Sequence, residues 1–174
     1  GINHYFSGLS SKLGSNLNDL SREGNGRGKI LDVWLTGANG KELFVIRTGS
    51  EIILNVRIRC EELNVRNLAL AISVNTLLGE GVLHFSTDVV GFSPNVETGQ
   101  VVLKCLVPKW NVRNGLFSLN FFLTIGGVIA DWVKDGFRIQ CEEGDYYGTG
   151  RLPPESHSRH LIDFSWSATN EVRK

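Results

Sequence analysis

The sequence contains no methionine, and only four of its 174 residues are proline. Because position 1 is glycine, we expect a domain cut from a larger protein, with Gly1 left by cleavage. Lysine plus arginine equals aspartate plus glutamate, 18 against 18, so the chain lacks the basic excess by which proteins bind nucleic acid or anionic membranes. No apolar run approaches the roughly 20 residues of a membrane-spanning helix, and no stretch has the pattern of a signal peptide.

The chain also lacks the motifs of common catalytic and metal sites. Its three cysteines, Cys60, Cys105 and Cys141, are odd in number and fit no metal-binding spacing, so we predict buried thiols in a reducing compartment. His157 and His160 have metal-ligand spacing but no cluster of further ligands, which favours a structural or exposed role. Phosphate-binding loops and nucleophile elbows are missing. We therefore expect no catalytic residue, cofactor or metal.

What the sequence does contain is period-two alternation, and it is clearest in residues 114–150. Apolar side chains fall at every second position of the first half: Phe117, Leu119, Phe121, Leu123 and Ile125. Such alternation is typical of a strand with one dry face and one wet face. Gly126-Gly127 supplies the positive φ angles of a two-residue hairpin turn. The sequence therefore predicts a long β-hairpin here.

Further strands are expected along the whole chain, with turn signals every 8 to 12 residues and no convincing helix. They cover residues 28–36, 51–60, 67–75, 79–86, 99–107 and 160–167. Together with the hairpin, these predict an all-β, antiparallel β-sandwich of immunoglobulin-like or jelly-roll type, with about eight strands. We expect residues 1–27 to be a linker or cleavage remnant with at most a weak helical turn, and residues 28–174 to be the sandwich domain.

The wet sides of three predicted strands suggest a binding surface. Small side chains at positions 69, 71 and 73 would form the floor of a groove if these strands are neighbours. Amides, arginines and an aromatic ring would line it, and such groups match the hydroxyls and C–H faces of sugars. The candidate carbohydrate contacts are Asn55, Arg57, Arg59, Ser73, Asn75, Asn120 and Phe122. The alternative is a solvated outer face that binds nothing.

The aromatic residues are expected either to pack in the core or to contact a ligand or partner at the surface. Trp34 and Trp132 lie within strands and are expected to be core or half-buried, whereas Trp110 in a loop and Trp166 on the terminal strand could be exposed. Tyr146-Tyr147 occupies a glycine-flanked loop, which favours contact with a ligand or partner.

The hairpin and its flanks resemble the C-terminal domain of the ATPase subunits (Wzt type) of bacterial O-polysaccharide ABC transporters. The positions that carry the likeness are Gly115, Leu119, Phe121, Asp131, Phe137, Gly148 and Gly150. The stretches GRGKILDVWLTGANGK, TGSEIILNVRIR and HLIDFSWS are similar to the family's first two strands and its last. The likeness covers roughly residues 26–167.

This resemblance implies a non-catalytic, carbohydrate-binding β-sandwich that recognises the end of an undecaprenol-linked O-polysaccharide before export. It also implies a cytoplasmic homodimer, peripheral to the inner membrane, that exchanges its last strand, residues 160–167. The stiff Pro153-Pro154 connector fits such an exchange. A nucleotide-binding domain and the transporter's membrane subunit would be its partners.

Two other interpretations stay open. The sandwich could serve only for protein docking or dimerisation, or it could be an appended module of a glycan-active enzyme.

Overall fold

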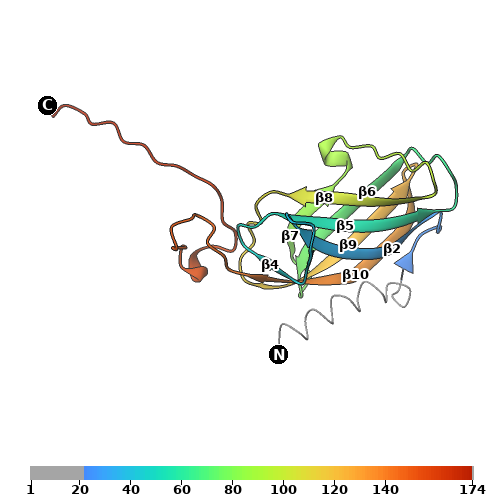
Figure 1. The fold of residues 1–174 in the computed structure, drawn as a ribbon, viewed down its shortest axis with the longest axis horizontal. Coiled ribbons are helices and arrows are strands. Elements are labelled where there is room, and N and C mark those ends of the chain that lie inside the picture. Colours follow the sequence, from blue (N-terminus) through green and yellow to red (C-terminus); the bar gives the residue numbers. More distant parts are fainter. Residues whose placement is uncertain (1–21, 174) are drawn as a thin grey trace.

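The structure, a computed structural model, describes residues 22–173. These residues form ten β-strands and two short 3-10 helices, η2 (Asp88–Val90) and η3 (Glu155–His157). The strands build two sheets that pack face to face (Figure 1). The predicted all-β, antiparallel β-sandwich is confirmed. The weak helical turn expected before residue 21 lies outside the described residues.

The first sheet, called sheet B, has four antiparallel strands. In spatial order they are β3 (Glu42–Leu43), β2 (Gly28–Gly37), β5 (Ile52–Cys60) and β8 (Gln100–Val107). Inward positions of β5 are apolar and buried, as the alternation predicts. In β2, Ile30 is buried together with Val33 and Leu35, because a bulge between Ile30 and Asp32 shifts the alternation by one residue. Strand β8 lies at an edge of the sheet, and several of its side chains remain half-exposed.

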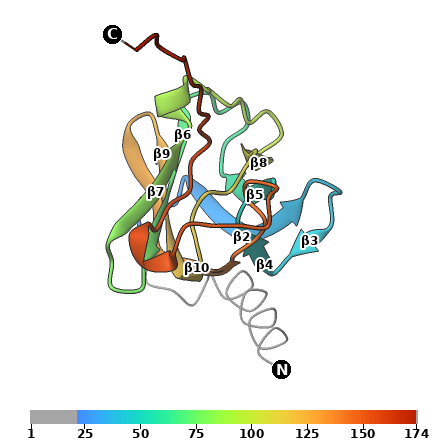
Figure 2. The ribbon, with the colours of Figure 1, turned by 90° about the vertical axis from the view of Figure 1, so that its left-hand side faces the viewer.

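The second sheet, called sheet A, contains the predicted hairpin. Its main path is β1 (Arg22–Glu23), β10 (Val128–Glu142), β9 (Gly115–Ile125), β6 (Leu68–Thr76) and β7 (Gly81–Ser86). A further short strand, β4 (Val45–Arg47), runs parallel to the end of β10. Viewed along the sandwich, β6, β7 and β9 lie on one side and β2, β5 and β8 on the other (Figure 2).

The hairpin turn has the predicted geometry. Gly126 and Gly127 have φ angles of 61° and 78°, which L-residues with side chains rarely adopt. The return strand is less regular than the alternation indicates, because its pairing with β9 shifts between Ile129 and Asp131 and again between Val133 and Phe137. These β-bulges decide which residues of β10 share a face with those of β9.

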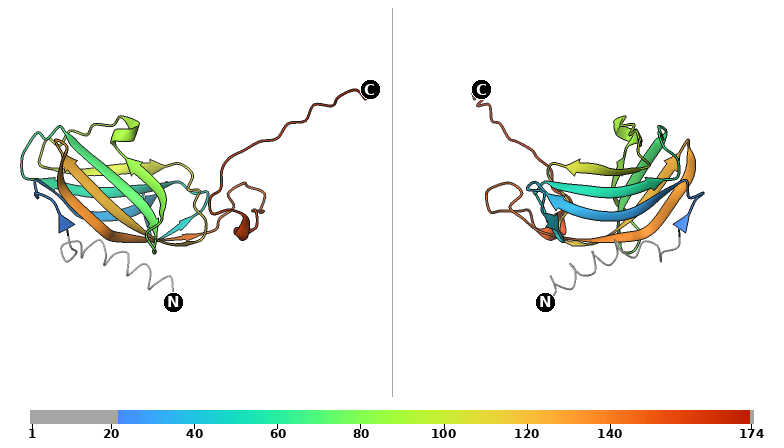
Figure 3. Two further views of the ribbon diagram at one scale, coloured as in Figure 1. Left: turned by 180° about the vertical axis from the view of Figure 1, so that it is seen from behind. Right: turned by 45° about the vertical axis from the view of Figure 1, so that its right-hand side comes forward.

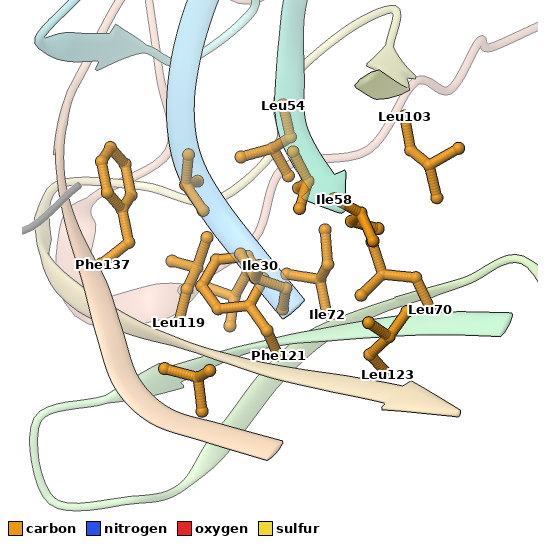
Figure 4. Packing of buried hydrophobic residues seen from close by; sticks show 14 of the residues in the cluster. Ile30, Leu54, Ile58, Leu70, Ile72, Leu103, Leu119, Phe121, Leu123 and Phe137 are labelled. Atoms are coloured by element: carbon orange, nitrogen blue, oxygen red, sulfur yellow. The ribbon is translucent and has the colours of Figure 1, made fainter. Parts of the chain in front are cut away.

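Apolar side chains from both sheets meet in one core (Figure 4). Leu54 and Ile58 of sheet B face Ile72 and Phe121 of sheet A, and all four are at most 3% exposed. Trp110 also belongs to this core with 0% exposure, although its place in a loop left open that it could be exposed. Its loop runs back towards the sandwich, and its backbone N–H and C=O bond to Ser50 and Gly49.

Asp131 joins the two sheets at one side of the sandwich. It lies in β10 of sheet A and is 3% exposed. Its carboxylate accepts a hydrogen bond from the backbone N–H of Ile30 in sheet B at 2.8 Å and pairs with the guanidinium of Arg22. Arg22 in turn donates to the carbonyl of Ile30 at 2.8 Å. A bulge follows Ile30 in β2, so these side chains bond backbone groups where the regular ladder is interrupted.

The structure adds detail at both ends of the expected domain. At the N-terminal end, sheet A already includes Arg22 and Glu23, which lie before the expected domain boundary at residue 28. At the other end, residues 160–167 form no strand within this chain, and only His160 makes a bridge, to Val112. The segment leaves the sandwich in an extended conformation, as Figure 3 shows from two sides. A strand needs a neighbouring strand for its backbone hydrogen bonds, and none lies beside this segment in the described chain.

Candidate carbohydrate-binding face

The seven predicted site residues lie on opposite faces of the sandwich. Ser73, Asn75, Asn120 and Phe122 point outward from sheet A, whereas Asn55, Arg57 and Arg59 point outward from sheet B. The prediction of a single groove is therefore wrong. Its premise was that the strand of residues 51–60 neighbours that of residues 67–75. The chain instead crosses from sheet B to sheet A between them, so β5 pairs with β2 and β8.

The other half of the premise is correct, because β6 and β9 are neighbours in sheet A. Ser73 lies opposite Asn120, and Asn75 lies opposite Ser118. The Nδ2 group of Asn75 donates to the hydroxyl of Ser73 at 3.1 Å. Four predicted residues thus share one surface with Ser118, which we call the sheet A outer face.

Small side chains form a strip along this face. Ala69 and Ala71 of β6 are followed by Ser73, and Ser86 of β7 lies opposite Ala71. On the β9 side, Phe122 lies opposite Ala71. Its ring makes an edge-to-face contact with Trp132 of β10, with centroids 5.4 Å apart. A low strip with an aromatic pair beside it suits a flat, polar ligand.

Trp132 was predicted only as core or half-buried, and it is half-buried on this outer face. The ammonium of Lys134 lies 4.1 Å from its ring centroid, a cation–π contact. Simple pairing across the Gly126-Gly127 turn would not place Trp132 beside Phe122. The bulge near Asp131 shifts the register by one residue.

A second bulge brings charge to the same face. Residues 134–136 lie opposite a single residue of β9, Asn120, and Asp135 adopts a φ angle of 49°. Its backbone N–H donates to Oδ1 of Asn120 at 2.7 Å. Its carboxylate accepts from the hydroxyl of Ser118 at 2.6 Å and from the guanidinium of Arg138 at 2.9 Å.

The carboxylate of Asp135 is stabilised in its ionised form. Hydrogen bonding from Arg138 lowers the pKa of Asp135; partial burial acts against this, and the Ser118 hydroxyl adds to the lowering. The sheet A outer face therefore carries a fixed carboxylate–guanidinium pair beside the amide of Asn120. Asp-Gly within a strand pattern signals an irregularity, and it was the one sequence signal that could have pointed to Asp135.

Of the predicted residues of sheet B, Asn55 and Arg57 are engaged within their own sheet, and Arg59 is exposed. Asn55 is 2% exposed, and its Nδ2 group donates to the carbonyl of Trp34 at 3.2 Å and to the hydroxyl of Thr36 at 3.1 Å. Arg57 pairs with Asp32 at 3.3 Å and lies 4.8 Å from the centroid of the Trp34 ring. The amide of Asn55 is thus already used to hold β5 against β2.

A further cluster of aromatic side chains lies where the chain leaves the hairpin. Tyr147 contacts Tyr146 and Phe164, with ring centroids 4.9 Å and 5.5 Å away. Its hydroxyl donates to the carbonyl of Ile162 at 3.0 Å. In this chain Tyr147 thus contacts the C-terminal segment of its own chain, and contact of the tyrosine pair with a ligand or partner stays a prediction. Trp166 is 90% exposed further along this segment.

Neither a metal centre nor a membrane helix is found among residues 22–173. No group of three or more His, Cys, Asp or Glu residues in this range could hold a metal ion. No helix in it has the length and apolar character needed to cross a bilayer.

Solved structures are similar to this one to different degrees. A crystal structure of the C-terminal domain of Wzt superposes with a TM-score of 0.63 at 18% identity, covering 87% of this chain and 88% of that one. A Niemann-Pick type C2 protein from the Japanese carpenter ant gives 0.47 at 13% identity, covering 70% and 99%. A β-D-mannosidase from Dictyoglomus thermophilum gives 0.43 at 15% identity, covering 60% and 12%. A search of the curated proteins found no match.

The family assignment does not depend on these superpositions. The family model described as the Wzt C-terminal domain matches residues 19–152, which is well over half of the chain. The match begins just before β1 and ends after the hairpin exit. This chain belongs to the Wzt C-terminal domain family.

Proposed function

We propose that this chain is a non-catalytic carbohydrate-binding domain that recognises O-antigen polysaccharide for export by an ABC transporter. The observation that carries the proposal is the sheet A outer face, where Asn120, Ser73 and Asn75 stand beside the Phe122–Trp132 pair. Amides and hydroxyls match the hydroxyls of a sugar, and the rings offer an apolar surface for its C–H groups.

The ligand would be the non-reducing terminal region of an undecaprenol-linked glycan. The Arg138–Asp135 pair adds groups that can exchange hydrogen bonds with a charged or hydroxylated sugar. The domain would act in the cytoplasm at the inner membrane. The nucleotide-binding domain and the transporter's membrane subunit would be its partners.

A titration of this chain with O-polysaccharide from its own strain tests the proposal. We expect saturable NMR chemical-shift changes with that glycan and none with an unrelated one. Asn120→Ala and Phe122→Ala should each weaken binding about tenfold, whereas Arg57→Ala on sheet B should leave it unchanged, because one lost contact is worth about 1–2 kcal/mol. If Arg57→Ala is the only one of the three variants that loses binding, the glycan site lies on sheet B instead.

The alternative, a docking or dimerisation module, is favoured by the C-terminal segment. Ile162, Phe164 and Trp166 alternate with polar residues and are 71%, 63% and 90% exposed. We propose a homodimer in which residues 160–167 pair with the other copy. A monomeric mass in solution would contradict it. A dimer that shows no shift with the cognate glycan would favour docking as the function.

A further inference from the structure

A cavity of about 430 Å³ opens between the two sheets at one edge of the sandwich. It lies where β7, one of the two edge strands of sheet A, faces β8, one of the two edge strands of sheet B. No ladder joins these two strands in the described part of the chain. On the far side of the sandwich, the hydrogen bonds of Asp131 and Arg22 close the gap between the sheets.

The floor and the rim of this cavity are both apolar. Leu54 and Val56 of sheet B and Leu70 and Ile72 of sheet A form part of the floor and are at most 4% exposed. The rim carries large apolar side chains that face water. They are Val89, Val90, Phe92 and Leu106, with exposures of 73%, 77%, 54% and 54%. Exposed apolar side chains that gather at one opening indicate a surface that is covered by a ligand or partner.

The chemistry of the walls selects the ligand. Among the described residues, the buried side-chain polar atoms without a partner belong to Trp110 and Gln140, and neither residue lines the cavity. Of the polar side chains that line the cavity, the hydroxyl oxygens of Ser86 and Thr87 already accept hydrogen bonds from the backbone N–H groups of Asp88 and Leu70. Burying an unpaired polar group costs free energy. A peptide segment that reaches the floor would bring backbone N–H and C=O groups against apolar side chains that offer them no partner. A hydrocarbon chain brings none.

We propose that this cavity binds the aliphatic chain of a single-chain amphiphile, whose polar end stays in water at the mouth. Its size is within the range of about 300–1,000 Å³ for small-molecule sites, which are mostly apolar. His84 and Lys104 lie on the edge strands at the opening, where they can meet the polar end. The aliphatic chain would lie between the sheets rather than on the sheet A outer face, and His84, which lies opposite Ser73, stands where the two sites meet.

Binding of cis-parinaric acid, a fluorescent fatty acid, to the full chain without glycan tests the proposal. We expect saturable fluorescence enhancement that unlabelled laurate competes away. Val90→Asp places a charge at the rim and should weaken binding at least tenfold. Val128→Asp makes the same change at the hairpin turn, where Val128 is 56% exposed, and should leave binding unchanged.

Cys105 reports where the ligand lies, because it lines the cavity and is the only half-exposed thiol of the three. Laurate should slow its modification by N-ethylmaleimide at least fivefold, as followed by mass spectrometry. Three results would overturn the proposal. The first is the absence of saturable binding, and the second is equal binding by the two aspartate variants. The third is a rate of Cys105 modification that laurate leaves unchanged but that the double change Phe164→Ser and Trp166→Ser increases. The last result would identify the C-terminal segment as the occupant.

Discussion

Replacing Asp131 by asparagine tests how the two sheets are joined. The carboxylate is 3% exposed, and it bonds both the guanidinium of Arg22 and the backbone N–H of Ile30. Asparagine keeps the size of the side chain and one acceptor oxygen, so no cavity is created. It removes the negative charge, and the Arg22 guanidinium, whose side chain is 14% exposed, then faces a neutral amide.

The size of the effect follows from this burial. Removing one partner of a buried ion pair typically costs about 3–5 kcal/mol. Because the amide retains one hydrogen bond and Arg22 keeps some contact with water, we expect the lower end, about 3 kcal/mol. In a domain of this size 1 kcal/mol shifts Tm by about 2–4 °C, so Tm should fall by about 6–12 °C.

Thermal and urea unfolding followed by circular dichroism measure this loss. Glu62→Gln is the matched control, since it removes the same kind of charge from the Arg27–Glu62 pair, whose side chains are 41% and 61% exposed. An exposed pair is worth less than about 1 kcal/mol. If Asp131→Asn is no more destabilising than Glu62→Gln, Asp131 does not hold the sheets together. Adding Arg22→Met to Asp131→Asn should cost less than the sum of the two single changes.

Three further predictions concern other charges and thiols. Because the pKa of Asp135 is lowered, its contribution to stability is present above the unfolded pKa near 4 and is lost as pH falls through the lower folded pKa; the Tm difference between wild type and Asp135→Asn should therefore shrink below about pH 4. Burial raises the pKa of Cys141 to about 12, so the stability that the protonated thiol contributes is complete below the unfolded pKa near 8.5 and is lost as pH rises towards 12. Wild type should therefore lose free energy of unfolding between pH 7 and pH 9.5, and in urea unfolding this loss should be about 1 kcal/mol smaller for Cys141→Ala. Arg113, which is 3% exposed, bonds the carbonyls of Pro153 and Pro154; Arg113→Met should release this loop, and trypsin should cleave after Arg151 about tenfold faster.

The sequence could predict the core because one face of each long strand is apolar. Leu119, Phe121 and Leu123 are buried where the alternation places them, and the Gly126-Gly127 turn follows from the need for positive φ. Trp110 shows the limit of this reasoning. Its loop has no periodicity, and its burial results from the packing of distant segments.

The candidate site was only half predictable, since alternation shows which side chains leave the core but not which sheet a strand joins. Asn120 and Ser73 do meet, because β6 and β9 are neighbours. Asn55 follows the same pattern, yet the chain crosses to the other sheet after β5. Asp135 reaches the face through a bulge, and the position of a bulge depends on both partner strands.

The same alternation separates stability from recognition in this fold. Asp131 lies between the sheets, so a change there should cost stability whatever ligand is bound. Ser73, Asn120 and Phe122 point away from the core, and changes at outward positions usually cost little stability. A glycan bound on the sheet A outer face would therefore be selected by residues that can vary without loss of the fold. Exchanging these three side chains should thus alter which polysaccharide binds while lowering Tm by about 2–4 °C, the value of the one hydrogen bond that Asn120 accepts from the N–H of Asp135. A much larger fall in Tm would show that they also support the sandwich.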